Sequence, residues 1–175
     1  METTQQIPES EMLDIAQRAF QLARMGDAAA LAALLDAALP VDLRNQNGDS
    51  LLMLASYNAH NDAARLLLAR GADPNFVNDQ GHTPLAGAAF KGDAGMIHLL
   101  VDHGAEIDGR CADGKTALIF AAMFDRVEAL EALIAAGAAA DLRDTAGASA
   151  LDMARAMGAE RVLQRLKNKS GVTSR

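Results

Sequence analysis

The segment GHTPLAGAAFKGD, residues 81–93, decides how this chain folds, because its residues return at a fixed interval. Glycines, hydroxyl-bearing residues, leucines and alanines each recur every 33 positions. The recurring sets are Gly48, Gly81, Gly114 and Gly147; Ser50, Thr83, Thr116 and Ser149; Leu52, Leu85, Leu118 and Leu151; and Ala55, Ala88, Ala121 and Ala154. A second signature, GADPN at 71–75, returns as GAEID at 104–108 and GAAAD at 137–141. A fixed interval of this length is typical of stacked structural repeats.

The chemistry of this segment predicts two helices in each repeat. Gly81 permits a tight turn, Thr83 can cap a helix with its hydroxyl, and Pro84 suits the first helical position, where no N–H bond is lost. Gly92 ends this helix, and Asp93 caps the next one. Helices of about two or three turns are unstable alone in water, so they must be stabilised by stacking.

Composition favours helices that pack closely together. Half of the 175 residues are hydrophobic but only 3% are aromatic, so the core is expected to consist of Leu, Ala, Val, Ile and Met. The length suits one domain. The net charge of −7 argues against a nucleic-acid partner, since phosphate binding requires the opposite sign of charge.

Cysteine usage and the first residues indicate a cytoplasmic protein with no membrane segment. The single cysteine, Cys111, excludes an internal disulfide and suits a reducing compartment. The opening METTQQIPES is polar and has no apolar core like that of a signal peptide. No apolar run approaches the roughly 18 residues that a spanning helix needs.

With its partner segment LLVDHGAEID, residues 99–108, the opening segment resembles the ankyrin repeat. The likeness covers roughly residues 12–167 and rests on the turn, the Thr-Pro-Leu helix start, the alanine pair and the Gly-Ala-Asp loop. Two departures stand out. Met53, Ala86 and Ile119 occupy the place of the family's histidine, and Cys111 replaces the Asp or Asn at a hairpin base that Asn45, Asn78 and Asp144 keep.

The resemblance implies an all-α solenoid of helix-turn-helix units with short β-hairpin turns. We expect five repeats including caps, in an ankyrin repeat domain over 9–168. The units are 9–45, 46–78, 79–111, 112–144 and 145–168. The first and last lack parts of the repeat signature, as the ends of a stack should, and residues 1–8 and 169–175 are expected to be flexible tails.

The resemblance also implies a protein-binding groove lined by the first helices and the hairpins. Tyr57, Phe90 and Met123 stand one period apart near the ends of first helices, where side chains face that groove. Exposed apolar rows with large aromatic side chains indicate an interface; the alternative is that these side chains pack back on the neighbouring repeat. The candidate partner-binding residues are Tyr57, Asn58, Phe90, Lys91, Met123 and Phe124 on the helices, and Asp49, Gln80, His82, Arg110, Asp113 and Lys115 in the hairpins.

Catalytic motifs are not found in the sequence. There is no G-x-S-x-G turn and no phosphate-binding glycine loop, and the carboxylates fall mostly on solvated faces. We therefore expect no catalytic residue, metal or cofactor, but a monomeric, non-enzymatic module that acts as an adaptor or inhibitor of an unknown protein. One alternative is a small metal-binding or redox protein that uses His82, His103 and Cys111, with Asp113 as a further metal ligand. Another is self-association through the same groove.

Two further hypotheses concern the hairpins. Arg44, Arg110 and Arg143 occupy matching positions, and Val77 interrupts their row. They are either solvated side chains or a contact line for an acidic partner. Cys111 is expected to be accessible but not strongly activated, because its only basic neighbours are Arg110 and Lys115.

Overall fold

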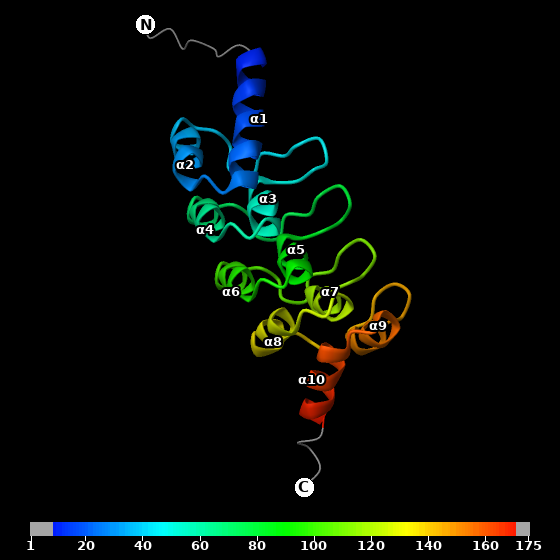
Figure 1. Ribbon diagram of the computed structural model, residues 1–175. Coiled ribbons are helices and arrows are strands. Elements are labelled where there is room, and N and C mark those ends of the chain that lie inside the picture. Colours follow the sequence, from blue (N-terminus) through cyan, green and yellow to red (C-terminus); the bar gives the residue numbers. More distant parts are fainter. Residues whose placement is uncertain (1–8, 171–175) are drawn as a thin grey trace, which may run out of the picture.

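The computed structural model describes residues 9–170, and within that range the chain forms a stack of ten helices (Figure 1). They are α1 (Glu9–Met25), α2 (Ala28–Asp36), α3 (Leu51–Tyr57), α4 (Asn61–Ala69), α5 (Pro84–Lys91), α6 (Ala94–Asp102), α7 (Ala117–Met123), α8 (Val127–Ala135), α9 (Ala150–Met157) and α10 (Glu160–Ser170). This confirms the expected all-α solenoid of helix-turn-helix units. Helix α10 continues two residues beyond the predicted end of the last unit at 168. The predicted tail at 169–175 is therefore wrong for residues 169–170, which belong to α10. The predicted tail at 1–8 and the remaining residues 171–175 lie outside the described residues.

The helices form two layers. The first helices of successive units pack against each other in the order α1, α3, α5, α7 and α9, and the second helices pack in the order α2, α4, α6, α8 and α10. The hairpin loops extend on the opposite side from α2, α4 and α6 (Figure 1). Within residues 9–170, no helix combines the length and apolar character needed to cross a lipid bilayer.

A hydroxyl cap begins each first helix from α3 to α9. The side chains of Ser50, Thr83, Thr116 and Ser149 accept hydrogen bonds from the backbone N–H three residues later, over 3.1, 3.1, 3.4 and 3.2 Å. Such caps satisfy N–H groups that have no partner inside the helix. They therefore fix where each helix begins. Because the capping residues recur every 33 positions, each first helix begins at the same place in its repeat.

Small and branched apolar residues fill the space between the layers. Leu52, Leu85 and Leu118 are at most 2% exposed. The matching alanines are fully buried: Ala55, Ala88, Ala121 and Ala154. Alanine at this position allows neighbouring helices to approach closely, which is how a core with few aromatic residues reaches a high packing density.

The hairpins are closed loops rather than paired strands. Each is held by a backbone hydrogen bond across its base, from Asn45 to Asp49, Asn78 to His82, Cys111 to Lys115 and Asp144 to Ala148, over 2.9–3.1 Å. In the described part of the chain, bridge pairing is limited to Arg44 with Ser50 and Arg143 with Ser149. At the tip, Gly81 has a φ of +77°, in the left-handed region that favours glycine.

Candidate functional site

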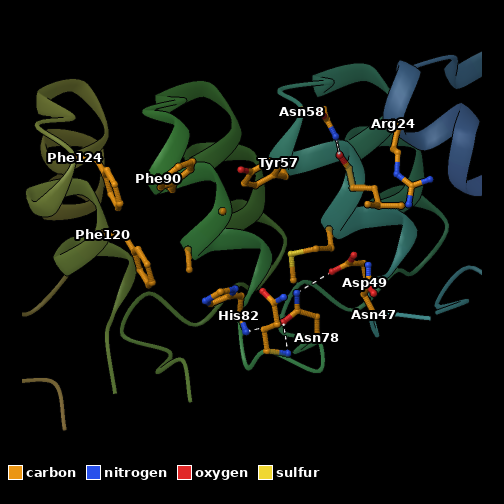
Figure 2. Close-up of a pocket in the computed structure, with 15 residues that line it drawn as sticks. Arg24, Asn47, Asp49, Tyr57, Asn58, Asn78, His82, Phe90, Phe120 and Phe124 are labelled. Atoms are coloured by element: carbon orange, nitrogen blue, oxygen red, sulfur yellow. Dashed lines mark hydrogen bonds between the residues drawn. The ribbon is translucent and has the colours of Figure 1, made fainter. Parts of the chain in front are cut away.

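A cavity of about 590 Å³ opens between the hairpins and the ends of the first helices (Figure 2). Seven of the predicted partner-binding residues line it: Asp49, Tyr57, Asn58, Gln80, His82, Phe90 and Phe124. The other five do not: Lys91, Met123, Arg110, Asp113 and Lys115. The structure therefore gathers residues of three successive repeats around one hollow.

Aromatic rings form one wall of the cavity. The rings of Tyr57 and Phe90 are stacked, with centroids 5.9 Å apart and planes 9° from parallel. Phe90 meets Phe124 edge to face, with centroids 4.5 Å apart. Tyr57 is 42% exposed, and the ammonium group of Lys91 lies 4.3 Å from the centroid of its ring. Solvent and any bound molecule therefore reach this aromatic row.

Met123 does not continue the row, although it stands one period after Phe90. Its side chain is partly buried and packs against the hydrophobic core. Helix α7 ends at Met123, and the next residue, Phe124, contacts Phe90 instead. The alternative that such side chains pack back on the stack thus holds at Met123, while Phe124 takes its place beside Phe90.

Polar groups of two successive hairpins form the opposite wall. The side-chain oxygen of Asn78 accepts hydrogen bonds from the N–H groups of Gln80 and His82, over 3.1 and 2.9 Å. Its amide nitrogen donates to Asp49 in the preceding hairpin over 2.8 Å (Figure 2). His82 contacts Phe120 edge to face, with ring centroids 5.9 Å apart. This wall is therefore held in one geometry by bonds both within and between repeats.

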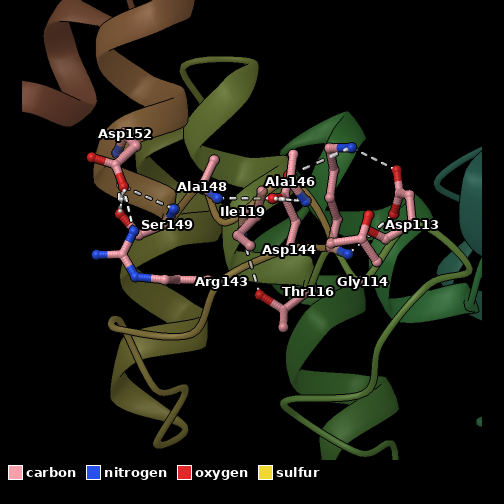
Figure 3. A network of polar contacts seen from close by, with 12 residues as sticks. Asp113, Gly114, Thr116, Ile119, Arg143, Asp144, Ala146, Ala148, Ser149 and Asp152 are labelled. Carbon is pink, nitrogen blue, oxygen red and sulfur yellow. Dashed lines mark hydrogen bonds and ion pairs between the residues drawn. The ribbon is translucent and has the colours of Figure 1, made fainter.

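The hairpin residues outside the cavity pair with one another. Lys115 contacts Asp113 over 2.6 Å and lies 3.9 Å from Asp144 of the next hairpin (Figure 3). Burial acts to raise the pKa of Asp113, but the hydrogen bonds and charge of Lys115 outweigh it, and the pKa lies below its ordinary value. Asp113 and Lys115 thus connect neighbouring repeats.

The arginine row has a role that neither sequence hypothesis anticipated. The guanidinium of Arg44 donates to the carbonyls of Gly48 and Val77, both over 3.2 Å. Arg110 repeats this arrangement with Gly114 and Arg143, over 2.9 and 2.6 Å. In the last hairpin, Arg143 donates to Gly147 and Asp152, over 2.6 and 3.1 Å (Figure 3). Each arginine closes its own hairpin and ties it to a neighbouring segment, so the row is a structural feature.

The prediction that Cys111 is accessible was wrong. Its side chain is 5% exposed, and burial raises the pKa of the thiol above its ordinary value. The reason is the position rather than the residue type, since the side chain of Asp144 at the matching position is only 4% exposed.

The residues of the metal or redox alternative do not form a ligand group within residues 9–170. His82 contacts Phe120, whereas a ring nitrogen of His103 pairs with the carbonyl of Leu99 over 2.8 Å. Among residues 9–170, no group of three or more His, Cys, Asp or Glu side chains is placed to hold a metal ion. The structure thus supplies no ligand set for that alternative.

Eight lining residues were not predicted as partner-binding: Arg24, Asn47, Met53, Leu54, Asn78, Ala86, Gly87 and Phe120. The 33-residue period carried a signal for two of them. Arg24 stands one period before Tyr57, and Asn47 stands one period before Gln80. The other six occupy repeat positions where no partner-binding residue was predicted, so only the stacked structure places them at the cavity.

Comparison with known proteins agrees with this architecture. A family model described as ankyrin repeats, three copies, matches residues 19–111 and 87–174. A segment of 56 residues is 51% identical to a Pseudomonas aeruginosa protein named as an ankyrin repeat protein, covering 32% of this chain and 33% of that protein. A segment of 62 residues is 44% identical to human ankyrin repeat domain-containing protein 29, covering 35% of this chain and 21% of that protein. The matched segments thus span a third or less of either relative.

The stacked helix pairs and projecting hairpins define the class of helical repeat proteins. Within that class, the chain belongs to the ankyrin repeat family. Ankyrin repeats are generally protein–protein interaction modules, and the family is typically non-enzymatic.

Proposed function

We propose that this protein is a non-enzymatic adaptor or inhibitor that acts as a cytoplasmic monomer. It binds a partner protein in the groove between the first helices and the hairpins. The observation that carries the proposal is the cavity of about 590 Å³, whose aromatic row of Tyr57, Phe90 and Phe124 faces an ordered polar wall.

The composition of the two walls suits protein recognition. Large aromatic side chains supply much contact area and are the usual anchors of interfaces. Polar groups around an apolar centre set orientation and specificity. Lys91 lies above the Tyr57 ring and extends the surface available to a partner, and we place Asp113 and Lys115 of the following hairpin at its rim.

The test is affinity capture from the native cell, followed by mass spectrometry and by capture of the same partner with single variants. We expect Tyr57→Ala, Phe90→Ala and Phe124→Ala to weaken capture while leaving the helical content unchanged. Truncated anchors of this type typically cost about 1–4 kcal/mol each, or roughly tenfold to a thousandfold in affinity.

Two sets of control variants separate binding from folding. Leu85→Ala and Leu118→Ala remove buried contacts, so we expect a loss of about 2–5 kcal/mol in stability and a lower Tm. Arg65→Ala and His98→Ala change exposed side chains of second helices, and we expect little effect on Tm or capture. If the aromatic variants destabilise the fold as much as the leucine variants, the row is core and the proposed binding face is wrong.

A further inference from the structure

Part of the cavity lies over a position where one repeat lacks a side chain that the others carry. Position 87 is glycine, whereas the positions one period away on either side hold Leu54 and Phe120, and the next holds Met153. Gly87 lies within α5, and it lines the cavity together with Leu54 and Phe120. The space above Gly87 thus includes the place that an apolar side chain occupies in the other repeats.

This hollow has apolar walls and enough room for a large group. A Cβ atom added to Gly87 would lie 3.5 Å from a ring carbon of Tyr57, an ordinary van der Waals contact. Tyr57, Phe90 and Phe120 surround the hollow on the helix side (Figure 2). Burying an apolar side chain against such rings is favourable, and pockets of this size commonly bind ligands. A bulky apolar side chain of a partner therefore fits over Gly87, where this repeat has no side chain.

The unpaired charges beside the hollow are positive, although the chain has a net charge of −7. Arg24 lines the cavity, and its guanidinium has no hydrogen bond or ion pair with any described side chain or carbonyl. Lys91 lies over the Tyr57 ring and, among the described residues, forms no ion pair with a carboxylate. A carboxylate of the partner would complement both cations.

The one carboxylate that lines the cavity already has partners. The two side-chain oxygens of Asp49 accept hydrogen bonds from the amides of Asn78 and Asn45, over 2.8 and 3.2 Å. Outside the lining, Asp79 of the neighbouring hairpin pairs with Arg44 over 3.0 Å. These acidic groups lie on the hairpin side, so a carboxylate is favoured on the helix side, where Arg24 and Lys91 lie.

Free amides along the hairpins indicate the backbone conformation of the partner. Asn47 and Gln80 stand one period apart and line the cavity, and both are exposed. Among the described residues, neither side-chain amide has a hydrogen-bond partner. These two amides can exchange hydrogen bonds with the free N–H and C=O groups of an extended chain, which a helix would not present.

We propose that the groove binds an extended segment of a partner protein that inserts one bulky apolar side chain over Gly87 and places a neighbouring carboxylate by Arg24 and Lys91. This inference rests on the proposed function and specifies the chemistry of the partner.

The first test selects phage-displayed random peptides of twelve residues on the full-length protein. We expect the enriched peptides to share an Asp or Glu next to a Leu, Met or Phe. A synthetic copy of the best peptide, labelled with a fluorophore, is then titrated with each variant and read by fluorescence anisotropy. Selection of no peptide, or of peptides without this pairing, would overturn the proposal.

The second test fills the hollow. We expect Gly87→Leu to weaken peptide binding by tenfold or more, with Tm unchanged or raised. Gly87→Met, which copies position 153, is a second variant in case the first does not fold. The matched control is Gly95→Leu, because Gly95 is an exposed glycine within α6 that does not line this cavity. If folded Gly87→Leu or Gly87→Met binds the peptide as tightly as the unchanged protein, the proposal fails.

The third test reverses charges on both sides of the contact. We expect Arg24→Glu to weaken binding of the acidic peptide and to restore binding of a peptide whose acidic residue is replaced by Lys. Added salt should weaken the unchanged pair, because salt screens exposed charges. No effect of Arg24→Glu on either peptide would contradict the assigned carboxylate position.

These outcomes also separate this inference from the proposed function. If Tyr57→Ala and Phe90→Ala lose the captured partner while folded Gly87→Leu retains it, the groove binds proteins but not in the way proposed. If neither partner nor peptide binds the groove, both proposals fail. Light scattering tests self-association. If the measured mass of the unchanged protein rises with concentration while Gly87→Leu stays monomeric, the groove binds a second copy of this chain and the peptide proposal fails.

Discussion

At the scale of single residues, Cys111 places a thiol at a hairpin base where the matching residues are Asn45, Asn78 and Asp144. Its thiol is buried, and burial raises the thiol pKa because the charged thiolate loses its hydration. Protons are therefore held more tightly in the folded state than in the unfolded state. This contribution to stability is present below the ordinary pKa of cysteine and is lost as the pH rises through the raised pKa of the folded state.

The first prediction concerns the reactivity of this thiol. We expect an aromatic disulfide reagent to label Cys111 in the native protein far more slowly than free cysteine at pH 8, and to label it rapidly after unfolding in guanidinium. The reason is that thiolate is the nucleophile, and burial limits both its formation and its access. Labelling of the native protein at the rate of free cysteine would contradict the buried position.

Substitution of Cys111 should also lower the stability of the fold more than a substitution at an exposed hairpin position would. We expect Cys111→Ser to lower stability by about 1 kcal/mol, because the buried hydroxyl loses its hydration and the backbone of Thr83 replaces only part of it. Cys111→Ala, which adds no polar group, is the control and should cost less. Thermal melts of the three proteins measure the difference.

Residue identities show where prediction from the sequence succeeds and where it stops. Thr83 and Pro84 act locally, so their roles at the start of α5 followed from the sequence. The burial of Cys111 and the hollow over Gly87 depend on what a neighbouring repeat does or does not provide. A missing side chain leaves no motif, so its effect becomes visible only once the repeats are stacked.

At the scale of structural elements, each hairpin is stabilised by ties to its neighbours. The helices could be predicted because caps and glycines mark their ends within the local sequence. The arginine ties could not, because most of their acceptors are backbone carbonyls, such as those of Val77 and Arg143, which every residue type has. A charged side chain at a loop base looks the same in the sequence whether it is solvated or bonded. The repeat that carries Val77 in place of arginine therefore lacks these hydrogen bonds.

The second prediction restores that tie. Val77 is 41% exposed and occupies the position that Arg44, Arg110 and Arg143 hold in other repeats. We expect Val77→Arg to donate to the carbonyls of Gly81 and Arg110 and to raise stability by about 0.5–1.5 kcal/mol. Val77→Lys is the control, because lysine lacks the planar fork that reaches two acceptors. Chemical denaturation measures both; a Val77→Arg protein no more stable than Val77→Lys would contradict the tie.

At the scale of the whole molecule, the stack depends on its ends as well as on its repeats. A repeat protein is stabilised by contacts between neighbouring units, so the outer face of an end unit must be polar. Helix α10 covers α8 with Arg161 and Arg165, which pair with Glu128 and Glu131, while Val162 is fully buried. The backbone N–H of Val162 also donates to Asp125 over 2.9 Å. The closing helix thus joins the preceding unit through apolar and polar contacts together.

The last prediction removes this closing unit. Deleting residues 148–175 takes away α9 and α10, which pack against α7 and α8. Leu130 and Leu133 of α8 are fully buried, and Ile134 packs against the core. We expect their loss of cover to lower Tm and to cause aggregation, since an unprotected apolar face reduces solubility. Deleting only 171–175 is the control, because it leaves α10 complete. Melting curves and light scattering distinguish the two proteins. The prediction fails if the protein without residues 148–175 stays monomeric and has the same Tm as the full chain. That result would show that the α7–α9 and α8–α10 contacts do not stabilise the stack and that the stack ends one unit earlier.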